Sequence, residues 1–524
     1  MAKWDDGYVT DVVYTSNFYR EITPAWLAST SLLLGYRPPD LRRKFSYADL
    51  GCGNGLTALI VAAACPHAEI WGFDFNPAHI EFATRLAAEA GLTNARFVES
   101  SFAALGHAPD GALPEFDFIV SHGVLSWISP ENRRHLMAVV AQRLKPGGLV
   151  YLSYNVTTGW SAMVPVRRLM RMLSMASAER TDIAAPGVLD FVDRLKGAGA
   201  LFFQANPGLE SRLTDIRRQD ARYIAHEYLN QDWHPLMFAD IAAEMLEAKC
   251  RYIGSATLAE NIEAVTVPTD VAPLLRDAHD PVLRETLRDL GCAQTFRRDI
   301  YRKGTAAVPG PEQQMLLEQL NLAGLGLAVP DDGPTFVTPI GNVTGKPEIY
   351  GPLLSMLETR PLNMGDARRA PPLAGLAPVE LLQAFSLLIA GGYAHPTLPE
   401  GGTAAGRDAC RRLNLAIAQA IAHAVDLTRL ASPVIGSAVG GDMLESLAVG
   451  EMLAGRAENV PELTTRLLEI LERSGRNVQR DGQVVTDRAD ATRIVADGVA
   501  DVLERRLPVL RRLGVVSTAV NSGN

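Results

Sequence analysis

Cysteine is scarce in this chain. Five cysteines are spread over 524 residues, their number is odd, and no two of them form a CxxC pair. A disulfide framework uses paired cysteines, and a structural zinc site uses closely spaced ones. We therefore expect no disulfide framework and no metal site. The thiols that we expect to be reduced and mostly buried are Cys52, Cys65, Cys250, Cys292 and Cys410.

Long apolar runs and a strong positive charge are also missing. No run reaches the roughly 18 apolar residues that a membrane-spanning helix needs. The first fourteen residues lack the basic flank and apolar core of a secretory signal. The formal net charge of −9 gives no overall attraction to nucleic acid. We expect a cytoplasmic protein without a membrane span, and we do not expect nucleic acid as a partner.

One stretch, residues 47–77, carries the pattern of a nucleotide-binding unit. It reads YADLGCGNGLTALIVAAACPHAEIWGFDFNP, which predicts a buried strand, a glycine-rich turn, an apolar helix and a second strand. Glycines at 51, 53 and 55 let the backbone turn sharply and approach a ligand closely. Asp74 follows the second strand, nineteen residues after Gly55, where a carboxylate can accept the two hydroxyls of a ribose.

Further strands and helices alternate after this unit. Strands are predicted over 95–99 and 116–121, and a loop followed by a further strand over 145–155, with helices over 77–90 and 130–144 between them. This alternation predicts an α/β fold, a doubly wound parallel sheet of the Rossmann-like type. Residues 161–235 lose the strand pattern, which predicts a helical cap inserted into the sheet domain, and residues 238–265 are predicted to return to the sheet.

The glycine spacing distinguishes between two adenosine cofactors. A dinucleotide fingerprint reads GxGxxG, whereas this chain has GxGxG preceded by Asp49. A carboxylate at the end of the first strand would repel a pyrophosphate but would suit the ammonium group of a methionine moiety. The turn therefore favours S-adenosylmethionine.

With these features in this order, residues 47–155 resemble a class I S-adenosylmethionine-dependent methyltransferase. The resemblance implies that Asp49 and Gly51 line the methionine end, Asp74 holds the ribose, Ser101 lies near the adenine amine, and His122 begins the loop on the substrate side. Many members carry Asp where this chain has Ser101, and a hydroxyl accepts a hydrogen bond more weakly than a carboxylate. The other residues that we expect to bind the cofactor are Cys52, Gly53, Gly55, Phe75, Ser100 and Phe102.

The resemblance extends beyond the sheet. Four segments, YTSNFYREITPAWL, SYNVTTGW, HEYLNQDWHPLMF and FRRDIYRKG, are similar to methyltransferases with an appended methyltransferase regulatory domain. That family includes the protein-lysine methyltransferases that modify rickettsial outer-membrane protein. It implies a catalytic domain, a middle regulatory region, a helical C-terminal region and a possible homodimer.

The predicted domain boundaries follow from these patterns. The expected parts are a cofactor-binding catalytic domain over 1–265 with its cap, a helical regulatory region over 266–330, a winged-helix-like module over 331–397, and a helical C-terminal domain over 398–524. The helix predicted within 378–390 contains no Lys or Arg, so we do not expect the winged-helix-like module to bind DNA.

The methyl acceptor is less constrained than the donor. A tyrosine-rich pocket could hold an amine while water carries its proton away. The candidates for that pocket are Tyr14, Tyr19, Tyr154, Trp160 and Tyr228, with His122 as a possible general base. We expect a structural role for His226 and Glu227, since adjacent residues of a helix point apart.

Three functions remain open from the sequence. They are a protein N-methyltransferase acting on lysine, a small-molecule N- or O-methyltransferase, and a non-catalytic cofactor-binding regulatory protein. The size of the chain favours the first, because a small-molecule enzyme rarely needs so many residues beyond its sheet.

Overall fold

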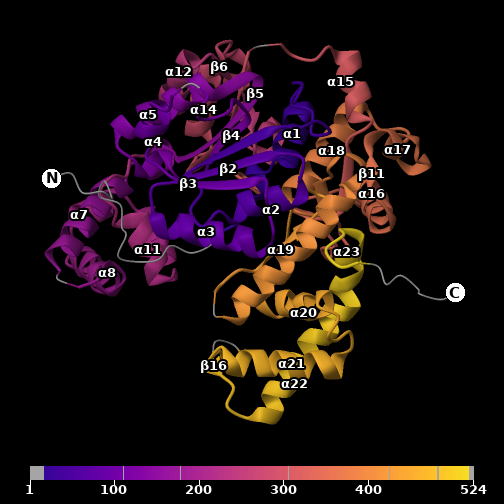
Figure 1. The fold of residues 1–524 in the computed structure, drawn as a ribbon. Coiled ribbons are helices and arrows are strands. Elements are labelled where there is room, and N and C mark those ends of the chain that lie inside the picture. Colours follow the sequence, from indigo (N-terminus) through magenta and orange to yellow (C-terminus); the bar gives the residue numbers. More distant parts are fainter. Residues whose placement is uncertain are drawn as a thin grey trace.

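The computed structural model describes residues 17–517 except 110, 178, 305, 424 and 481–482. Its centre is a seven-stranded sheet with the order β3-β2-β1-β4-β5-β7-β6 (Figure 1). The first five strands are parallel, and β7 runs antiparallel to both β5 and β6. The bounds of the strands are β1 (Ser46–Leu50), β2 (Glu69–Asp74), β3 (Ala95–Glu99), β4 (Phe116–Ser121), β5 (Leu144–Asn155), β6 (Cys250–Ser255) and β7 (Phe296–Lys303).

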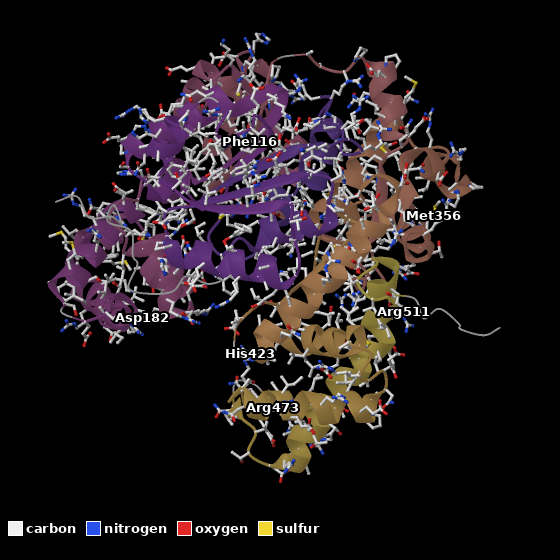
Figure 2. The ribbon with its side chains drawn as sticks, viewed as in Figure 1. Phe116, Asp182, Met356, His423, Arg473 and Arg511 are labelled. Carbon is white, nitrogen blue, oxygen red and sulfur yellow. The ribbon has the colours of Figure 1, made fainter. Side chains whose placement is uncertain are left out.

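Helices cover both faces of this sheet, as the alternating pattern predicts. Strand residues point to the two faces in turn, so Tyr47 of β1 joins one apolar core while its neighbour Ala48 joins the other. The first core is covered by α1 (Pro24–Leu33), α2 (Leu56–Ala64) and α3 (Pro77–Glu89). The second is covered by α4 (Phe102–Gly106), α5 (Pro130–Arg143) and α12 (Phe238–Glu247). Figure 2 shows Phe116 of β4 within this sheet layer. The predicted α/β fold is therefore confirmed.

A helical cap leaves the sheet after β5. Its helices are α6 (Thr157–Trp160), α7 (Met163–Ala176), α8 (Thr181–Gly197), α9 (Leu201–Ala205), α10 (Leu209–Arg217) and α11 (Ala221–Tyr228). The cap has its own apolar core, in which Met170 and Val192 are fully buried. Figure 2 places Asp182 of α8 at the far edge of the cap.

The region after β6 differs from its prediction. Residues 266–330 were expected to be helical, and they do contain α13 (Ala272–Asp277), α14 (Pro281–Gly291) and α15 (Gly310–Leu317). The same region also supplies β7, which is inserted between β5 and β6. The wholly helical prediction is wrong there, because RRDIYRK pairs with two strands that lie far away in the sequence and supply the hydrogen bonds.

The segment after α15 forms a second, small sheet. Its strands β8 (Asn321–Gly324), β11 (Leu362–Asn363) and β12 (Ala394–Pro396) have the order β11-β8-β12. Beside them lie a hairpin of β9 (Thr335–Thr338) and β10 (Gly341–Thr344), and the helices α16 (Pro347–Thr359), α17 (Met364–Arg369) and α18 (Pro378–Ala390). Much of α18 is buried, including Phe385 and Leu388, so those residues are not available as a recognition surface. The winged-helix-like module stays a prediction.

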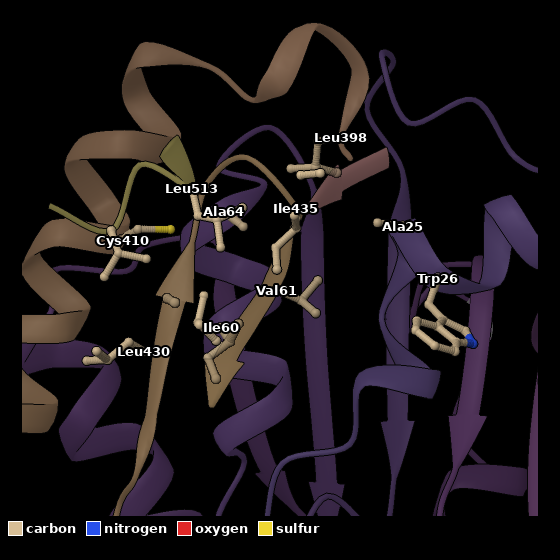
Figure 3. Packing of buried hydrophobic residues seen from close by; sticks show 14 of the residues in the cluster. Ala25, Trp26, Ile60, Val61, Ala64, Leu398, Cys410, Leu430, Ile435 and Leu513 are labelled. Carbon is tan, nitrogen blue, oxygen red and sulfur yellow. The ribbon is translucent and has the colours of Figure 1, made fainter. Parts of the chain in front are cut away.

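The C-terminal helices share a core with the seven-stranded sheet. Their elements are α19 (Ala404–Ala422), β13 (Arg429–Ser432), β14 (Ser437–Gly440), α20 (Met443–Leu453), α21 (Val460–Arg473), the short strands β15 (Gln479–Arg480) and β16 (Gln483–Val484), α22 (Arg488–Asp501) and α23 (Leu507–Arg512). Figure 3 shows Ile60 and Ala64 of α2 close to Cys410 and Leu430 from this region. At Gly406 of α19 a Cβ would stand 2.8 Å from the carbonyl oxygen of Ala64. Glycine is therefore needed for this close approach of α19 to α2.

A buried ionic cluster ties α14 to β7 and β5. The guanidinium of Arg297 donates to Asp299 at 2.8 Å, to Asp289 at 2.6 Å and to Glu285 at 3.0 Å, and Arg297 is only 4% exposed. The Tyr154 hydroxyl donates to the second oxygen of Asp299 at 2.6 Å. Burial raises the pKa of Asp289 to about 7. Three carboxyl groups thus share the charge of Arg297, and Glu285 has a second arginine, Arg288, at 3.3 Å.

Removing that arginine should destabilise the protein strongly. We expect Arg297→Met to lower the free energy of unfolding by about 3–5 kcal/mol at pH 8, because it leaves buried carboxylates without a cation. The loss should be smaller at pH 5, where the carboxyls with raised pKa are protonated and no longer repel one another. Denaturant unfolding at the two pH values measures both effects.

The matched control is the exposed pair of Arg505 and Asp501, whose side chains are 81% and 50% exposed. Arg505→Met should cost less than about 1 kcal/mol. Equal losses in the two variants would contradict the role of the buried cluster.

Candidate active site

A cavity of about 140 Å³ opens at the carboxyl ends of β1, β2 and β4. Ligands of open α/β sheets bind at this edge, where the strand order reverses. The residues that line the cavity are Asn17, Tyr19, Gly51, Cys52, Gly53, Asn54, Leu56, Asp74, Phe75, His79, Phe102, His122, Gly123, Val124, Trp127, Ile128 and Glu227. The glycine turn and the tips of the strands were identified from the sequence as parts of the site, whereas the cap helix α11, which contributes Glu227, and the segment of Trp127 and Ile128 were not.

The glycine turn forms the floor of the cavity. Gly51 and Gly53 have φ angles of +84° and +53°, in the left-handed region that favours glycine. A Cβ on Gly51 would stand 2.5 Å from Val124, whereas a Cβ on Gly53 would meet no atom within 4 Å. Gly53 therefore faces the open space in which a ligand can approach the backbone. Gly55 does not line the cavity and is the residue before α2, where Phe97 and Ala83 leave no room for a side chain.

Asp74 is held rigidly at the end of β2. One of its oxygens accepts a hydrogen bond from the Gly53 amide at 2.9 Å, and the other accepts from the Asn76 amide at 2.9 Å. His79 Nδ1 lies 3.2 Å from the second oxygen. Each carboxylate oxygen can still accept another hydrogen bond. The geometry therefore orients Asp74 for a pair of ribose hydroxyls, as its position in the sequence predicts.

Asp49 lies beneath the glycine turn and is only 4% exposed. Burial, with a smaller contribution from the charge of Asp74, raises the pKa of Asp49 to about 7. No hydrogen bond or ion pair joins its carboxyl group to the described residues. On the cavity wall, the buried indole N–H of Trp127 also has no acceptor in the described part of the chain. A ligand that carries both an ammonium and a carboxylate group would match these two groups.

His122 stands at the tip of β4, on the wall beyond the glycine turn. Its ring stacks on Tyr19 with centroids 3.6 Å apart, and the Tyr19 amide donates to Thr57 of α2 at 3.3 Å. Burial, aided by the charge of Arg298, holds the pKa of His122 well below its usual value. The imidazole is therefore neutral, so it can accept a hydrogen bond but holds an added proton only weakly.

The structure brings together most of the residues predicted from the glycine turn and the strand tips, but not all of the predicted aromatic residues. Trp160 packs against Tyr228 and donates its indole N–H to the Thr295 carbonyl at 2.8 Å, and neither ring lines the cavity. The prediction for Tyr154 is wrong, because its side chain is fully buried and bonded to Asp299. Tyr14 lies outside the described residues.

Two predicted adenine contacts also lie off the cavity. The Ser101 hydroxyl accepts a hydrogen bond from the Ala104 amide at 3.2 Å and caps α4. Ser100 donates to the Ser101 carbonyl at 3.2 Å. Their neighbour Phe102 does line the cavity, so both serines lie next to the cavity wall. Their contact with adenine stays a prediction.

Several lining residues were not anticipated as part of the site. His79 follows Asp74 by five residues on α3, and this short spacing is a signal that could have identified it. Trp127 and Ile128 lie in or after the turn η2 (Leu125–Trp127), whose path the sequence did not indicate. Glu227 was expected to have a structural role. It lines the cavity because the folding of the cap brings α11 to the sheet edge, which the local sequence does not indicate.

Within the part of the chain that the structure describes, two kinds of feature are not found. No group of three or more His, Cys, Asp or Glu side chains is placed to hold a metal ion. No helix is both long enough and apolar enough to cross a bilayer.

Comparisons with known proteins agree with this geometry. Residues 48–148 match the family model described as "Methyltransferase domain", and residues 220–303 match "Predicted methyltransferase regulatory domain". An uncharacterized protein of Synechocystis sp. is 32% identical over 514 residues, which cover 98% of this chain and 99% of that protein. An uncharacterized protein of Rickettsia prowazekii is 28% identical over 232 residues, 42% of this chain and 86% of that protein.

A solved structure shares the fold over nearly the whole chain. PKMT2 from Rickettsia typhi, solved in complex with AdoHcy, aligns with a TM-score of 0.69 at 21% identity. The alignment covers 96% of this chain and 100% of that chain. The arrangement of sheet, cap and C-terminal helices is therefore shared by the two proteins.

The residues of the cavity fit S-adenosylmethionine. Gly53 leaves space beside the backbone, and Asp74 is placed for the ribose. Asp49 does not itself line the cavity but lies below the glycine turn, as a buried carboxyl group that lacks a cation among the described residues. The ammonium and carboxylate groups of the methionine moiety match Asp49 and the Trp127 indole N–H.

The pKa of Asp49 makes cofactor binding depend on pH. A bound cation favours the ionised carboxylate, so below pH 7 binding must release a proton. We expect the affinity for S-adenosylmethionine to fall about fifteenfold in total between pH 7 and pH 5.5, as the ionised fraction of Asp49 decreases. Asp49→Asn should bind weakly and show little pH dependence over this range. Calorimetric titration of the two proteins measures this, and a flat profile in the native protein would contradict the assignment.

The ribose contact gives a second expectation. Asp74→Ala should weaken the binding of S-adenosylmethionine at least tenfold, because it removes two charge-assisted hydrogen bonds of about 1.5–3 kcal/mol each. The exposed Asp408 on α19 offers a control, and Asp408→Ala should leave the calorimetric affinity unchanged. Unchanged binding in Asp74→Ala would show that the ribose lies elsewhere.

Three observations agree on the family of this chain. The sheet order and the glycine turn form the expected cofactor site. The two family models match the sheet and the segment from α11 to β7. A relative at 32% identity covers the chain from end to end. The protein is an enzyme that uses S-adenosylmethionine, and it belongs to the class I S-adenosylmethionine-dependent methyltransferases that carry a methyltransferase regulatory domain.

Proposed function

We propose that this enzyme methylates the amine nitrogen of lysine side chains in a polypeptide acceptor. The observation that carries the proposal is the surface of the cap. Of the nineteen large apolar side chains that are exposed among the described residues, eight lie between residues 164 and 202. They are Val164, Met172, Met175, Ile183, Phe191, Leu195, Leu201 and Phe202.

These side chains form stripes on two packed helices. On α7, Val164, Met172 and Met175 follow one another at spacings of about two turns and one turn, so they share a face. On α8, Ile183, Phe191 and Leu195 also follow one another at spacings of about two turns and one turn. Exposed apolar surface of this extent is typical of sites that bind a macromolecule, and methionine adapts to varied partners. A small-molecule enzyme would have no need of such a surface.

The cap also reaches the site of chemistry. Its helix α11 packs against α7 and α8 and contributes Glu227 to the cavity. A polypeptide held on the outer helices α7 and α8 would therefore bind the same cap that borders the cavity through α11. Of the three arginines of α7, Arg167 is buried and Arg171 donates to the Leu229 carbonyl. Arg168 is exposed on this helix, where it can contact an acidic side chain of the acceptor.

The cavity wall suits an amine. The rings of Tyr19, Trp127 and Phe102 line it together with the carboxylate of Glu227, and aromatic faces and a carboxylate both attract an alkylammonium group. When bound, S-adenosylmethionine supplies a methyl group on a positively charged sulfur. The chain then has to hold the deprotonated amine in line with that methyl group, and such alignment can lower the barrier by about 7–11 kcal/mol.

The comparisons support a protein acceptor. The fold of the Rickettsia typhi protein named PKMT2 covers cap, sheet and C-terminal helices. The sequence resembles protein-lysine methyltransferases strongly up to about residue 305 and weakly beyond it. The regulatory-domain match includes α11, which borders the cavity in this chain.

The test combines a label with a change of the cap surface. Tritiated S-adenosylmethionine is incubated with the enzyme and a lysate of the cells that produce it, and the products are fractionated by size. We expect label in proteins, on lysine after hydrolysis, and at least fivefold less label with the double variant Met172→Ser, Met175→Ser. Calorimetry should show unchanged cofactor affinity in that variant.

The matched control is Val337→Ser, since Val337 is 82% exposed on the hairpin of β9 and β10. It should label proteins as the native enzyme does. Label confined to small solutes would contradict the proposal and favour a small-molecule methyltransferase. A change of oligomeric state in the double variant, seen by light scattering, would assign the stripe to self-association instead.

A further inference from the structure

Tyr151 contacts the imidazole ring of His122, which lines the cavity. Tyr151 lies in the middle of β5 and pairs with Val120 of β4. Val120 precedes His122 by two residues in the sequence. Its hydroxyl oxygen is 2.7 Å from His122 Nδ1, and the two rings lie nearly parallel, with centroids 5.8 Å apart. Tyr19 stacks on His122 at 3.6 Å. The imidazole is thus fixed by a stacked ring and by one hydrogen bond to a fully buried tyrosine.

We propose that Tyr151 is a positioning residue: its hydroxyl oxygen accepts the Nδ1–H of His122, which leaves the Nε2 lone pair facing the cavity as the acceptor for an N–H of the attacking amine. No hydrogen bond joins Nε2 to the described residues, and the ring lines the cavity. The inference rests on the proposed function, because it is an amine acceptor that offers an N–H to this wall.

The choice of nitrogen decides what the ring can do. A neutral imidazole has one N–H and one lone pair. If Tyr151 donated to Nδ1, the N–H would be on Nε2 and would compete with the methyl group for the lone pair of the amine. If Nδ1–H donates to Tyr151, the Nε2 lone pair instead orients the amine through its N–H and leaves the lone pair of the amine free.

The surroundings keep the ring neutral. The groups that face it are Tyr151 of β5, Tyr19 ahead of η1 (Arg20–Ile22), and Phe296 and Arg298 of β7. The guanidinium of Arg298 opposes a positive charge on the imidazole, as burial does. His122 therefore does not hold the proton that the acceptor loses. In the transfer, the nitrogen lone pair forms the C–N bond, the C–S bond breaks with its electron pair passing to sulfur, and the surplus proton of the amine passes to water.

The matched control is another buried tyrosine. Tyr47 lies on β1 in the same apolar core as Tyr151, and its hydroxyl has no hydrogen-bond partner among the described residues. Tyr47→Phe therefore removes a buried hydroxyl without touching His122. Tyr151→Phe removes the hydroxyl that contacts Nδ1 and keeps the ring.

The experiment measures the tautomer and the rate separately. In protein labelled with [15N]histidine, long-range proton–nitrogen correlation spectra report which nitrogen of His122 carries the proton, and the His122→Gln spectrum assigns its signals. We expect Nδ1–H in the native protein and in Tyr47→Phe, and a shift toward Nε2–H in Tyr151→Phe. Tyr151→Phe should also lower kcat for protein labelling at least tenfold while the calorimetric affinity for S-adenosylmethionine stays within twofold.

The outcomes distinguish this inference from the proposed function. An Nε2–H tautomer in the native protein, or a full rate in Tyr151→Phe, would overturn the role of Tyr151 even if lysine residues are labelled. Label on small solutes alone would overturn the protein acceptor. In that case an Nδ1–H signal lost in Tyr151→Phe would still support the hydrogen bond that positions His122.

Discussion

The site depends on a carboxylate that the fold buries without a cation. Asp49 lies one residue before the end of β1, under the glycine turn, where burial raises its pKa to about 7. A buried charge is costly unless it is paired. In the role that we propose for Asp49, S-adenosylmethionine would bring a positive charge to this position and supply the missing ion pair. Cofactor binding would then be linked to the protonation of Asp49.

The rest of the chain stabilises the frame around that carboxylate. On one face, α19 and β13 of the C-terminal region pack on α2, which begins at the last glycine of the turn (Figure 3). At the other side of the sheet, the Arg297 cluster joins α14 to β7 and, through Tyr154, to β5. The segment that matches the regulatory-domain model is therefore part of the sheet itself. A movement of α14 would displace the Arg297 cluster and, through Tyr154, the strand β5 that also carries Tyr151.

The cap connects the cofactor site to a larger surface. Its inner helix α11 places Glu227 in the cavity, and its outer helices α7 and α8 expose apolar stripes. Tyr19, His122 and Trp127 complete the wall between them. An acceptor that bound both the cavity and the apolar stripes would be selected in two ways. Its amine would bind in the cavity, and the residues around that amine would bind on the stripes.

The local sequence by itself determined the donor side of this enzyme. Gly51, Gly53, Asp49 and Asp74 lie within one strand–turn–helix–strand unit, so chain connectivity alone brings them together and the cofactor could be predicted. The alternation of strands and helices likewise predicted the parallel part of the sheet. Tertiary structure decided the remaining features: β7 forms between β5 and β6, Tyr154 turns into an ionic cluster, and Glu227 and Trp127 enter the cavity. Each of these features depends on contacts between segments far apart in the chain. Local periodicity and residue spacing do not predict which of those contacts forms.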